Sequence, residues 1–303
     1  MNPAVVVLAG GSGGAKLARG MLEVVGEQAL TVIANTGDDT EIYGAHVSPD
    51  PDLVTFWLAD LIDERGWGLR EDTFAVMDGL RALGREVWFN LGDRDLAVAI
   101  ERARLLNAGV RLTEAQAALA AALGVKARVL PMSDRPVRTR VQAQGRWWTF
   151  QEFMIRGDQE GPVQALEFAG AQAAAPTPEV AEALARAQAI VIGPSNPVIS
   201  IGPILALPGL RAMLRDAAAP VVAVSPVVGG RVLKPATAPF MELLGYPLSA
   251  AGVSAYYGEL IDGLVCDEPL DTLPALHTDV LMEGAQGRRR LAEQTLQFAL
   301  SLR

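Results

Sequence analysis

An open α/β sheet, mostly parallel and covered by helices on both faces, is the architecture expected of this sequence. Short, strongly apolar runs rich in β-branched residues occupy residues 4–9, 30–34, 189–192 and 220–224. Each run ends in a loop of Gly, Asn, Asp, Ser or Pro, which is typical of buried parallel strands. The chain has 303 residues, half of them hydrophobic, and suits a single domain over 1–303. A helical and hairpin insertion is expected at about 93–160.

The first part of the chain is expected to open with a strand–turn–helix unit. The strand at 4–9 and the glycine-rich turn lead into a helix over 15–25. After the second strand we expect a polar loop and then an amphipathic helix over 53–59. A further helix is expected over 72–83, and the aromatic run at 88–89 is expected to mark a strand end.

Residues 93–123 follow a helical pattern that breaks once, at 107–109, with Asp93 and Thr113 as expected N-caps. We expect this helical pair to lie outside the main sheet. The remaining expected elements are a strand at 128–131, a hairpin of 137–141 with 147–153, an Ala/Pro-rich loop at 167–178 and a last helix over 288–302.

The composition of the chain argues against several broad classes of protein. The net charge of −9 and the isoelectric point near 4.9 argue against a general nucleic-acid binder. The single cysteine, Cys266, excludes an internal disulfide framework and fits a cytoplasmic protein. The first apolar run lacks a basic segment before it and is soon interrupted by glycines, so it is interpreted as a strand and not a signal peptide. We expect neither a nucleic-acid partner nor a membrane partner.

The glycine-rich turn between the first strand and helix is a candidate phosphate-binding loop. Glycines permit positive φ and let a phosphate approach the N–H groups at a helix N-terminus. The spacing is neither a full dinucleotide fingerprint nor a Walker A loop, and a plain turn without a ligand is the alternative. The candidate residues are Gly10, Gly11, Ser12, Gly13, Gly14 and Lys16.

Four aspartates, on what we expect to be two neighbouring loops, are candidate catalytic groups and metal ligands. Asp38 and Asp39 follow the second strand, and Asp50 and Asp52 follow soon after. Mg²⁺ is commonly bound by one or two carboxylates together with substrate phosphate oxygens. The alternative is a pair of turns with solvated acids.

The histidines and the aromatic residues give weaker indications of function. Neither His46 nor His277 is paired with a nucleophile or a second metal-ligand histidine, which gives little support to hydrolase or zinc-peptidase chemistry. Five aromatic residues cluster in one third of the chain and either belong to the core or line a slot for a flat ring. They are Phe56, Trp57, Trp67, Trp88 and Phe89.

Taken in order, these loops resemble the 2-phospho-L-lactate transferases of coenzyme F-420 biosynthesis. The resemblance covers nearly the whole chain, and its most specific motifs are Gly-Asp-Arg-Asp-Leu-Ala at 92–97 and Gly-Pro-Ser-Asn-Pro at 193–197. The chain departs from the family pattern after Lys234, at Val98 and Ala99, and at Pro51. The matching segments are 8–17, 35–39, 47–52, 88–97, 130–134, 136–139, 150–153, 192–205 and 224–230.

The resemblance implies a Rossmann-like fold and a Mg²⁺-dependent phosphotransferase. Such an enzyme moves a phospholactyl group, or its phosphoenolpyruvyl or phosphoglyceryl equivalent, from a guanosine diphosphate ester to the deazaflavin Fo. GMP leaves, and F-420-0 or dehydro-F-420-0 forms. The sequence does not distinguish the three acids. A homodimer is also implied.

The resemblance also implies roles for particular residues. Asp38 and Asp50 would hold the metal, while Asp39 or Asp52 would orient or deprotonate the attacking hydroxyl. The glycine loop with Ser195 and Asn196 would hold the phosphates and the guanosine. The residues expected at the deazaflavin are Trp88, Asn90, Asp93 and Arg94.

Two other functions remain as alternatives. A related family of gluconeogenesis-factor regulators binds nucleotide sugars without catalysis, and the Asp93-Arg94-Asp95 segment argues against it. An NAD(P)-dependent oxidoreductase would usually carry an acid at the end of the second strand, where Asn35 stands.

Overall fold

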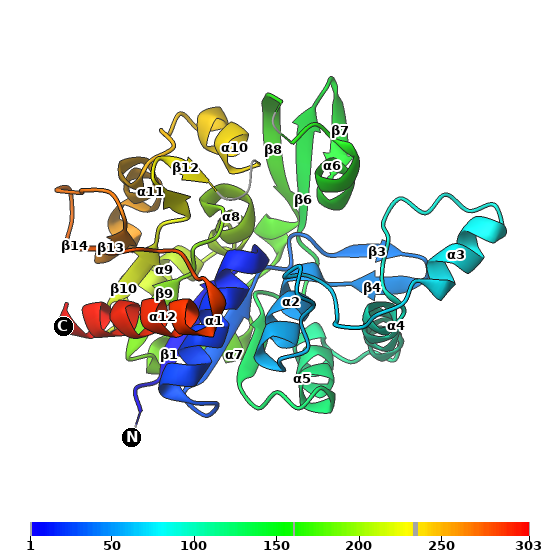
Figure 1. Ribbon diagram of the computed structural model, residues 1–303, viewed down its shortest axis with the longest axis horizontal. Coiled ribbons are helices and arrows are strands. Elements are labelled where there is room, and N and C mark those ends of the chain that lie inside the picture. Colours follow the sequence, from blue (N-terminus) through cyan, green and yellow to red (C-terminus); the bar gives the residue numbers. More distant parts are fainter. Residues whose placement is uncertain (1, 160, 233–235, 303) are drawn as a thin grey trace.

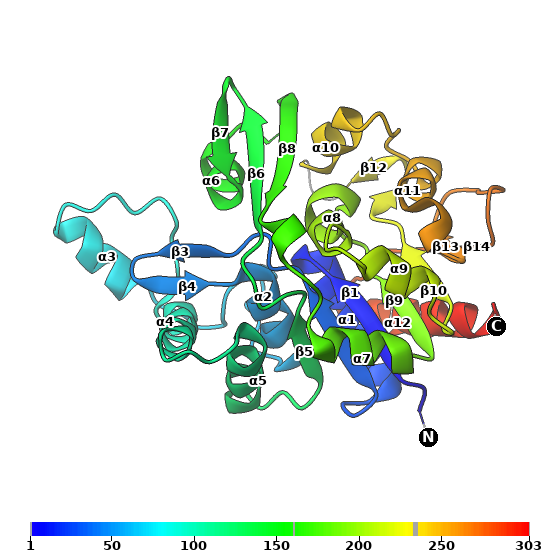
Figure 2. The same ribbon diagram turned by 180° about the vertical axis from the view of Figure 1, so that it is seen from behind.

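The computed structural model describes residues 2–159, 161–232 and 236–302, so Lys234 and Pro235, in the departure noted above, lie outside the described residues. Its centre is a seven-stranded sheet in which every neighbouring pair is parallel (Figures 1 and 2). All four predicted runs are strands of this sheet, which confirms the expected fold class. In spatial order the strands are β14 (Ala275–His277), β13 (Gly263–Cys266), β10 (Val221–Val224), β9 (Ala189–Ile192), β1 (Val5–Ala9), β2 (Leu30–Ala34) and β5 (Arg128–Pro131).

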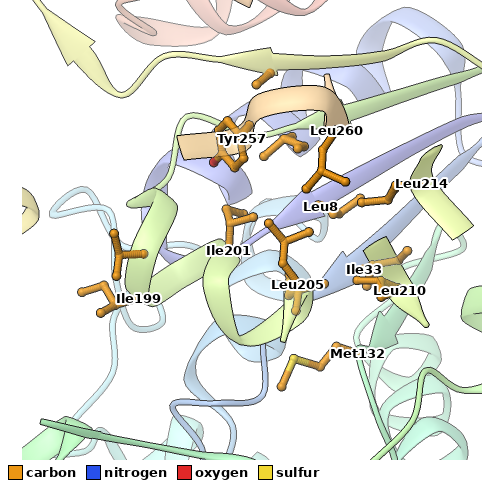
Figure 3. Close-up of a cluster of buried hydrophobic side chains, with 14 of the residues drawn as sticks. Leu8, Ile33, Met132, Ile199, Ile201, Leu205, Leu210, Leu214, Tyr257 and Leu260 are labelled. Atoms are coloured by element: carbon orange, nitrogen blue, oxygen red, sulfur yellow. The ribbon is translucent and has the colours of Figure 1, made fainter. Parts of the chain in front are cut away.

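Helices cover both faces of the sheet because its strands are apolar on both sides. Val5 and Val7 pack in one core, and Val6 and Leu8 in the other, as the two-residue period of a strand requires. On the first face lie α1 (Gly11–Val25), α2 (Pro49–Leu58), α5 (Leu112–Ala122) and α12 (Gly284–Ser301). On the second lie α7 (Pro178–Arg186), α8 (Gly202–Leu205), α9 (Leu210–Arg215) and α11 (Ala250–Tyr257). Figure 3 shows part of this second core, around Leu8, Ile33 and Leu205.

Two additions to the central sheet follow the carboxyl ends of the neighbouring strands β2 and β5. The first, which we call the arm, has its own small core around Val47, Met77 and Leu96. It extends to one side in Figure 1 and ends in α3. The arm consists of β3 (Thr40–Ile42), β4 (Ala45–Val47), α3 (Ala75–Ala82) and α4 (Asp93–Asn107). The second addition is an antiparallel sheet of β6 (Arg138–Ala143), β7 (Arg146–Thr149) and β8 (Val163–Ala169), with α6 (Phe150–Arg156).

The remaining short elements connect these parts. They are η1 (Ala171–Ala173), η2 (Pro197–Ile201), η3 (Gly258–Leu260), β11 (Val227–Val228), β12 (Arg231–Val232) and α10 (Thr237–Leu243).

Several local predictions were wrong, for identifiable reasons. Asp50 and Asp52 lie in the first turn of α2 and not in a loop, because Pro49 already begins that helix. Residues 150–153 are helical, and 163–169 form β8, which pairs with β6. Residues 85–90 contain no strand, so the aromatic run does not mark a strand end.

Both predicted helix caps also differ. Helix α5 begins at Leu112 with Arg111 as its N-cap, in place of Thr113. Asp93 lies within the first turn of α4, and its carboxylate caps a different helix, as described below.

Candidate active site at the carboxyl edge of the sheet

A cavity of about 1010 Å³ opens at the carboxyl ends of the central strands. Parallel α/β sheets bind their ligands at this edge. The turn after β1, the loop after β2 and the segments after β9 and β10 all contribute to it, and the arm and α6 form further walls. Of the predicted residues, Gly10, Gly11, Ser12, Gly13, Lys16, Asp38, Asp50, Asp52, Trp88, Asn90, Ser195 and Asn196 line the cavity.

The glycines of the first turn allow two loops to touch. A Cβ on Gly13 would lie 1.9 Å from the backbone oxygen of Pro194, and one on Gly10 would lie 2.5 Å from that of Ser200. Such distances are far below van der Waals contact, so neither position tolerates a side chain without backbone movement. Gly11 begins α1 with φ near +62°, which favours glycine. The turn therefore needs glycine for close packing as well as for any ligand.

The N-terminus of α1 retains two N–H groups that face the cavity. Gly11 donates to the Asp50 carboxylate at 2.6 Å, and Gly14 donates to the Ser195 hydroxyl at 3.1 Å. The N–H groups of Ser12 and Gly13 have no hydrogen-bond partner in the part of the chain that the structure describes. Unpaired N–H groups at the start of a helix are suited to binding an anion such as phosphate.

The segment after β9 provides one further unpaired donor. Asn196 uses its side-chain oxygen to accept from the N–H groups of Val198 and Ile199. Its buried Nδ2 has no partner among the described residues, so it is free to donate to a ligand. Ser195, in contrast, donates to the carbonyl of Gly10 and so joins the two loops.

Asp38 and Asp50 are brought together by Asn35. The Nδ2 group of Asn35 lies 3.1 Å from an oxygen of Asp38 and 2.9 Å from an oxygen of Asp50, while Gly37 donates to Asn35 Oδ1 at 2.7 Å. Both carboxylates are buried, with 6 % and 4 % of their surface exposed.

This donor set fits Mg²⁺. Among residues 2–159, 161–232 and 236–302 there is no cluster of three or more metal-binding side chains. Mg²⁺ does not require one, because it commonly uses one or two carboxylates and completes its shell with substrate phosphate and water. Asp38 and Asp50, beside the N-terminus of α1, would provide the two carboxylates.

Asp52 forms a buried ion pair that links the arm to α2. Arg102 of α4, whose side chain is fully buried, contacts both Asp52 oxygens and also donates to the carbonyl of His46 at 3.0 Å and to Gln116 at 3.3 Å. Burial raises the pKa of Asp52, and the Arg102 charge and hydrogen bonds oppose this rise. The pair holds α4 against the helix that carries Asp50.

Asp39 faces away from the main cavity. It accepts from Ser48 Oγ at 2.7 Å and lies 3.1 Å from His46 Nε2. Asp39 and His46 line a second, smaller cavity of about 200 Å³, together with Thr36 and Arg138. Asp39 therefore does not line the main cavity with the other three aspartates, although its charge lies close enough to Asp52 to add to the effect of burial in raising the pKa of that carboxyl group.

Asp93 and Asp72 cap each other's helices. The Asp93 carboxylate accepts from the N–H groups of Ala75 and Val76 at the start of α3. The Asp72 carboxylate accepts from those of Arg94 and Asp95 at the start of α4. The hydrogen bond from Thr73, followed by those from the α3 backbone, lowers the pKa of Asp93. Neither Asp93 nor Arg94 lines the cavity, although both were expected at the deazaflavin.

The arm supplies an aromatic wall. Trp88 and Phe89 stack with their ring centroids 5.6 Å apart, and Phe74 lies on the same side of the cavity. Asn90 also lines it, with Oδ1 accepting from Arg81 at 2.8 Å. Because such a wall is flat and apolar, it suits a planar ring.

Asp95 lies on the arm side of the cavity and was not predicted as a site residue. Burial, followed by the nearby charges of Asp52 and Asp72, raises its pKa to about 7, against the opposing effect of Arg102. No hydrogen bond reaches its carboxyl group from the residues that the structure describes.

Asn35, Arg102 and Asp95 are the functional candidates that the sequence interpretation missed. Asn35 directly follows β2 and precedes Asp38 by three residues, and the sequence interpretation noted it only because it is not an acid. Arg102 lies three residues after Ala99, on the buried side of α4. This spacing indicates that Arg102 is buried, but it does not identify the residue with which Arg102 pairs.

Comparison with known proteins agrees with the geometry. The profile of the family described as 2-phospho-L-lactate transferase CofD matches residues 5–276. The chain is 37 % identical to a 2-phospho-L-lactate transferase of Methanosarcina mazei, over 97 % of this chain and 99 % of that protein. It is 41 % identical to a phosphoenolpyruvate transferase of Streptomyces griseus, over 95 % and 97 % of the two chains.

Among solved structures, a UPF0052-family protein from Bacillus halodurans is similar in fold. The TM-score is 0.64 at 16 % identity, over 98 % of this chain and 99 % of that one. At this identity the likeness concerns the fold alone. Separately, no helix in the described part of the chain is long and apolar enough to cross a bilayer.

Proposed function

The chain belongs to the 2-phospho-L-lactate transferase family and is a transferase, and we propose that its acceptor is the deazaflavin Fo. In this proposal the donor is a guanosine diphosphate ester of a three-carbon acid, and GMP is released. Relatives named for phospholactate and for phosphoenolpyruvate are similarly close, so lactate, enolpyruvate and glycerate esters are all candidate donors.

The observation that carries the proposal is the division of one cavity into two chemically different sides. On one side are the unpaired N–H groups of Ser12 and Gly13, the Asn196 amide and the Asp38–Asp50 pair. On the other is the aromatic wall of the arm. The whole cavity has a volume of about 1010 Å³, at the upper end of the range for ligand sites, and can admit two substrates together.

In the transfer, the oxygen of the acceptor's terminal hydroxyl forms a bond to the donor phosphorus next to the acid. The bond from that phosphorus to the GMP oxygen breaks, GMP leaves with that oxygen, and the hydroxyl proton passes to solvent water. Phosphoryl-type transfer depends mainly on positioning and charge neutralisation. When bound to Asp38 and Asp50, Mg²⁺ would supply positive charge at the diphosphate.

The chain's own residues would then hold the reactants. Ser12 and Gly13 donate their N–H groups to the diphosphate, and Asn196 donates its amide to the donor. Asp52 is engaged by Arg102, and Asp39 by Ser48. We therefore assign both to holding the segments that carry Asp38 and Asp50, in place of the base role first considered.

The test is incubation with Fo, Mg²⁺ and each guanylated acid, followed by mass detection of the product and of GMP. We expect transfer from at least one donor. A matched control is Asp271→Asn, which removes an exposed carboxylate remote from the cavity lining and should not change turnover. Failure of all three donors would contradict the proposal.

Fo binding separates this proposal from the regulator alternative. An aromatic wall with a few hydrogen bonds is expected to give a micromolar site, on the order of 8 kcal/mol. A nucleotide-sugar regulator has no reason to bind a deazaflavin. Saturable binding of a nucleotide sugar, with none of Fo up to millimolar concentration in a fluorescence titration, would favour the regulator.

A further inference from the structure

Asp95 is a cavity-lining carboxyl group whose surroundings disfavour its charge. It projects from the first turn of α4, in a cavity whose arm side is otherwise largely aromatic and aliphatic. The charged groups that face it are Asp52 from α2, Asp72 from the segment before α3, and Arg102 from its own helix. Arg102 is already neutralised by Asp52, so Asp95 lacks a cation of its own.

The carboxyl group of Asp95 also differs from those of Asp52, Asp72 and Asp93 in making no structural hydrogen bond. Asp72 caps α4, Asp93 caps α3 and Asp52 holds Arg102. In the described part of the chain the Asp95 carboxyl group makes no such contact, whereas its backbone N–H donates to Asp72. A half-buried polar group without a partner has an energetic cost that a ligand can relieve.

We propose that Asp95 is a specificity-determining residue that binds, as a neutral carboxylic acid, the imide edge of the acceptor's planar ring. This inference rests on the proposed function, because it takes the ring acceptor as the ligand of the aromatic wall. The acid's O–H donates to a ring carbonyl, and its C=O accepts from the adjacent ring N–H. These two complementary hydrogen bonds form without leaving a charge in the cavity.

The neutral form is the one that the site favours. Burial and two neighbouring carboxylates raise the pKa of Asp95 to about 7, far above that of an ordinary aspartate. An ionised carboxylate would place a negative oxygen against the ring carbonyl and repel it. Ionisation would instead favour guanine, whose adjacent N1–H and N2–H groups are both donors, so keeping the acid neutral removes this preference for the donor's base.

The test compares Asp95→Asn with Asp95→Ala, using Fo, the guanylated donor and Mg²⁺. An asparagine amide presents the same donor and acceptor as a neutral acid. We expect Asp95→Ala to raise the KM for Fo about tenfold, since two hydrogen bonds are lost, with kcat and the donor KM within about twofold. Asp95→Asn is expected to restore the KM for Fo. Asp271→Ala serves as the exposed control.

The pH dependence gives an independent readout. Because only the protonated acid binds, the wild-type KM for Fo, divided by that of Asp95→Asn, should rise about tenfold from pH 6 to pH 8 for a pKa of about 7. Dividing by the Asn variant cancels any ionisation of Fo itself. An Fo analogue methylated at the imide nitrogen should bind the wild type about as weakly as Fo binds Asp95→Ala.

Three results would overturn this role for Asp95 while the wild type still transfers to Fo. They are an unchanged KM in Asp95→Ala, a loss of kcat at constant KM in Asp95→Asn (the behaviour of a general base), and an increase confined to the donor KM. If the wild type neither binds nor modifies Fo, the proposed function fails and this inference fails with it.

Discussion

Replacing Arg102 by methionine is expected to destabilise the protein strongly. The guanidinium is fully buried, contacts both Asp52 oxygens and donates to the His46 carbonyl. Methionine fills a similar volume but leaves Asp52 buried without a cation. Removing one partner of a buried ion pair costs about 3–5 kcal/mol, a large part of the total stability of a typical domain.

The size of this loss should depend on pH. Burial raises the pKa of Asp52, and Arg102 lowers it, so removing Arg102 raises it further. A carboxyl group whose pKa is raised in the folded state contributes most to stability below its unfolded pKa, and that contribution is lost as the pH rises. The difference between wild type and Arg102→Met should therefore be larger at pH 8 than at pH 5, because the protonated Asp52 needs no cation.

Urea unfolding followed by tryptophan fluorescence measures both effects. The matched control is Arg104→Met on the same helix, where an exposed pair with Glu101 is lost and little change is expected. The double variant Arg102→Met with Asp52→Leu should recover about half of the lost unfolding free energy, since it leaves no buried charge without a partner. The reasoning is refuted if Arg102→Met is no less stable than Arg104→Met, or if the double variant is as unstable as the single one.

Three further predictions test other parts of the structure. Asp38→Asn should abolish transfer, with a stability change within about 1 kcal/mol because the amide has the same shape; near-normal turnover at saturating Mg²⁺ would remove Asp38 from the mechanism. Gly13→Ala should cost about 1–3 kcal/mol, because its Cβ would meet Pro194 at 1.9 Å, whereas Gly79→Ala, with open space on α3, should cost nothing in a thermal melt. We also expect a homodimer, so light scattering should give twice the 32.1 kDa chain mass, and a monomer would contradict this.

The sequence predicted the parts of the fold that local pattern determines. Each apolar run became a strand of the main sheet, and the turn after β1 became the start of a helix, because buried strands and glycine turns carry strong signals. Open α/β sheets bind ligands beyond the carboxyl ends of their strands. Because Asp38, Asp50 and Asn196 follow such ends in the sequence, we expect them at one site, and all three line the cavity.

The rest depends on contacts between distant segments, which no local pattern encodes. Nothing near Arg102 in the sequence identifies Asp52, fifty residues earlier, as its partner. Asp93 lies where the sequence predicts an N-cap of its own helix, α4. Its carboxylate instead accepts from the first N–H groups of α3, and Asp72 accepts from those of α4. Residues 163–169 contain few β-branched residues, and only pairing with β6 makes them a strand.

The strand order has a consequence for how the protein is made. β1 lies inside the sheet, with β2 on one side and β9 on the other, and Val5 pairs with both Leu30 and Ala189. During synthesis at about 5–20 residues per second, one edge of β1 therefore remains without its partner for roughly 10–40 s. An apolar, unpaired strand edge is prone to aggregation. Slower translation between the codons for β2 and β9 should lower the soluble yield, even though it changes no residue of the finished protein.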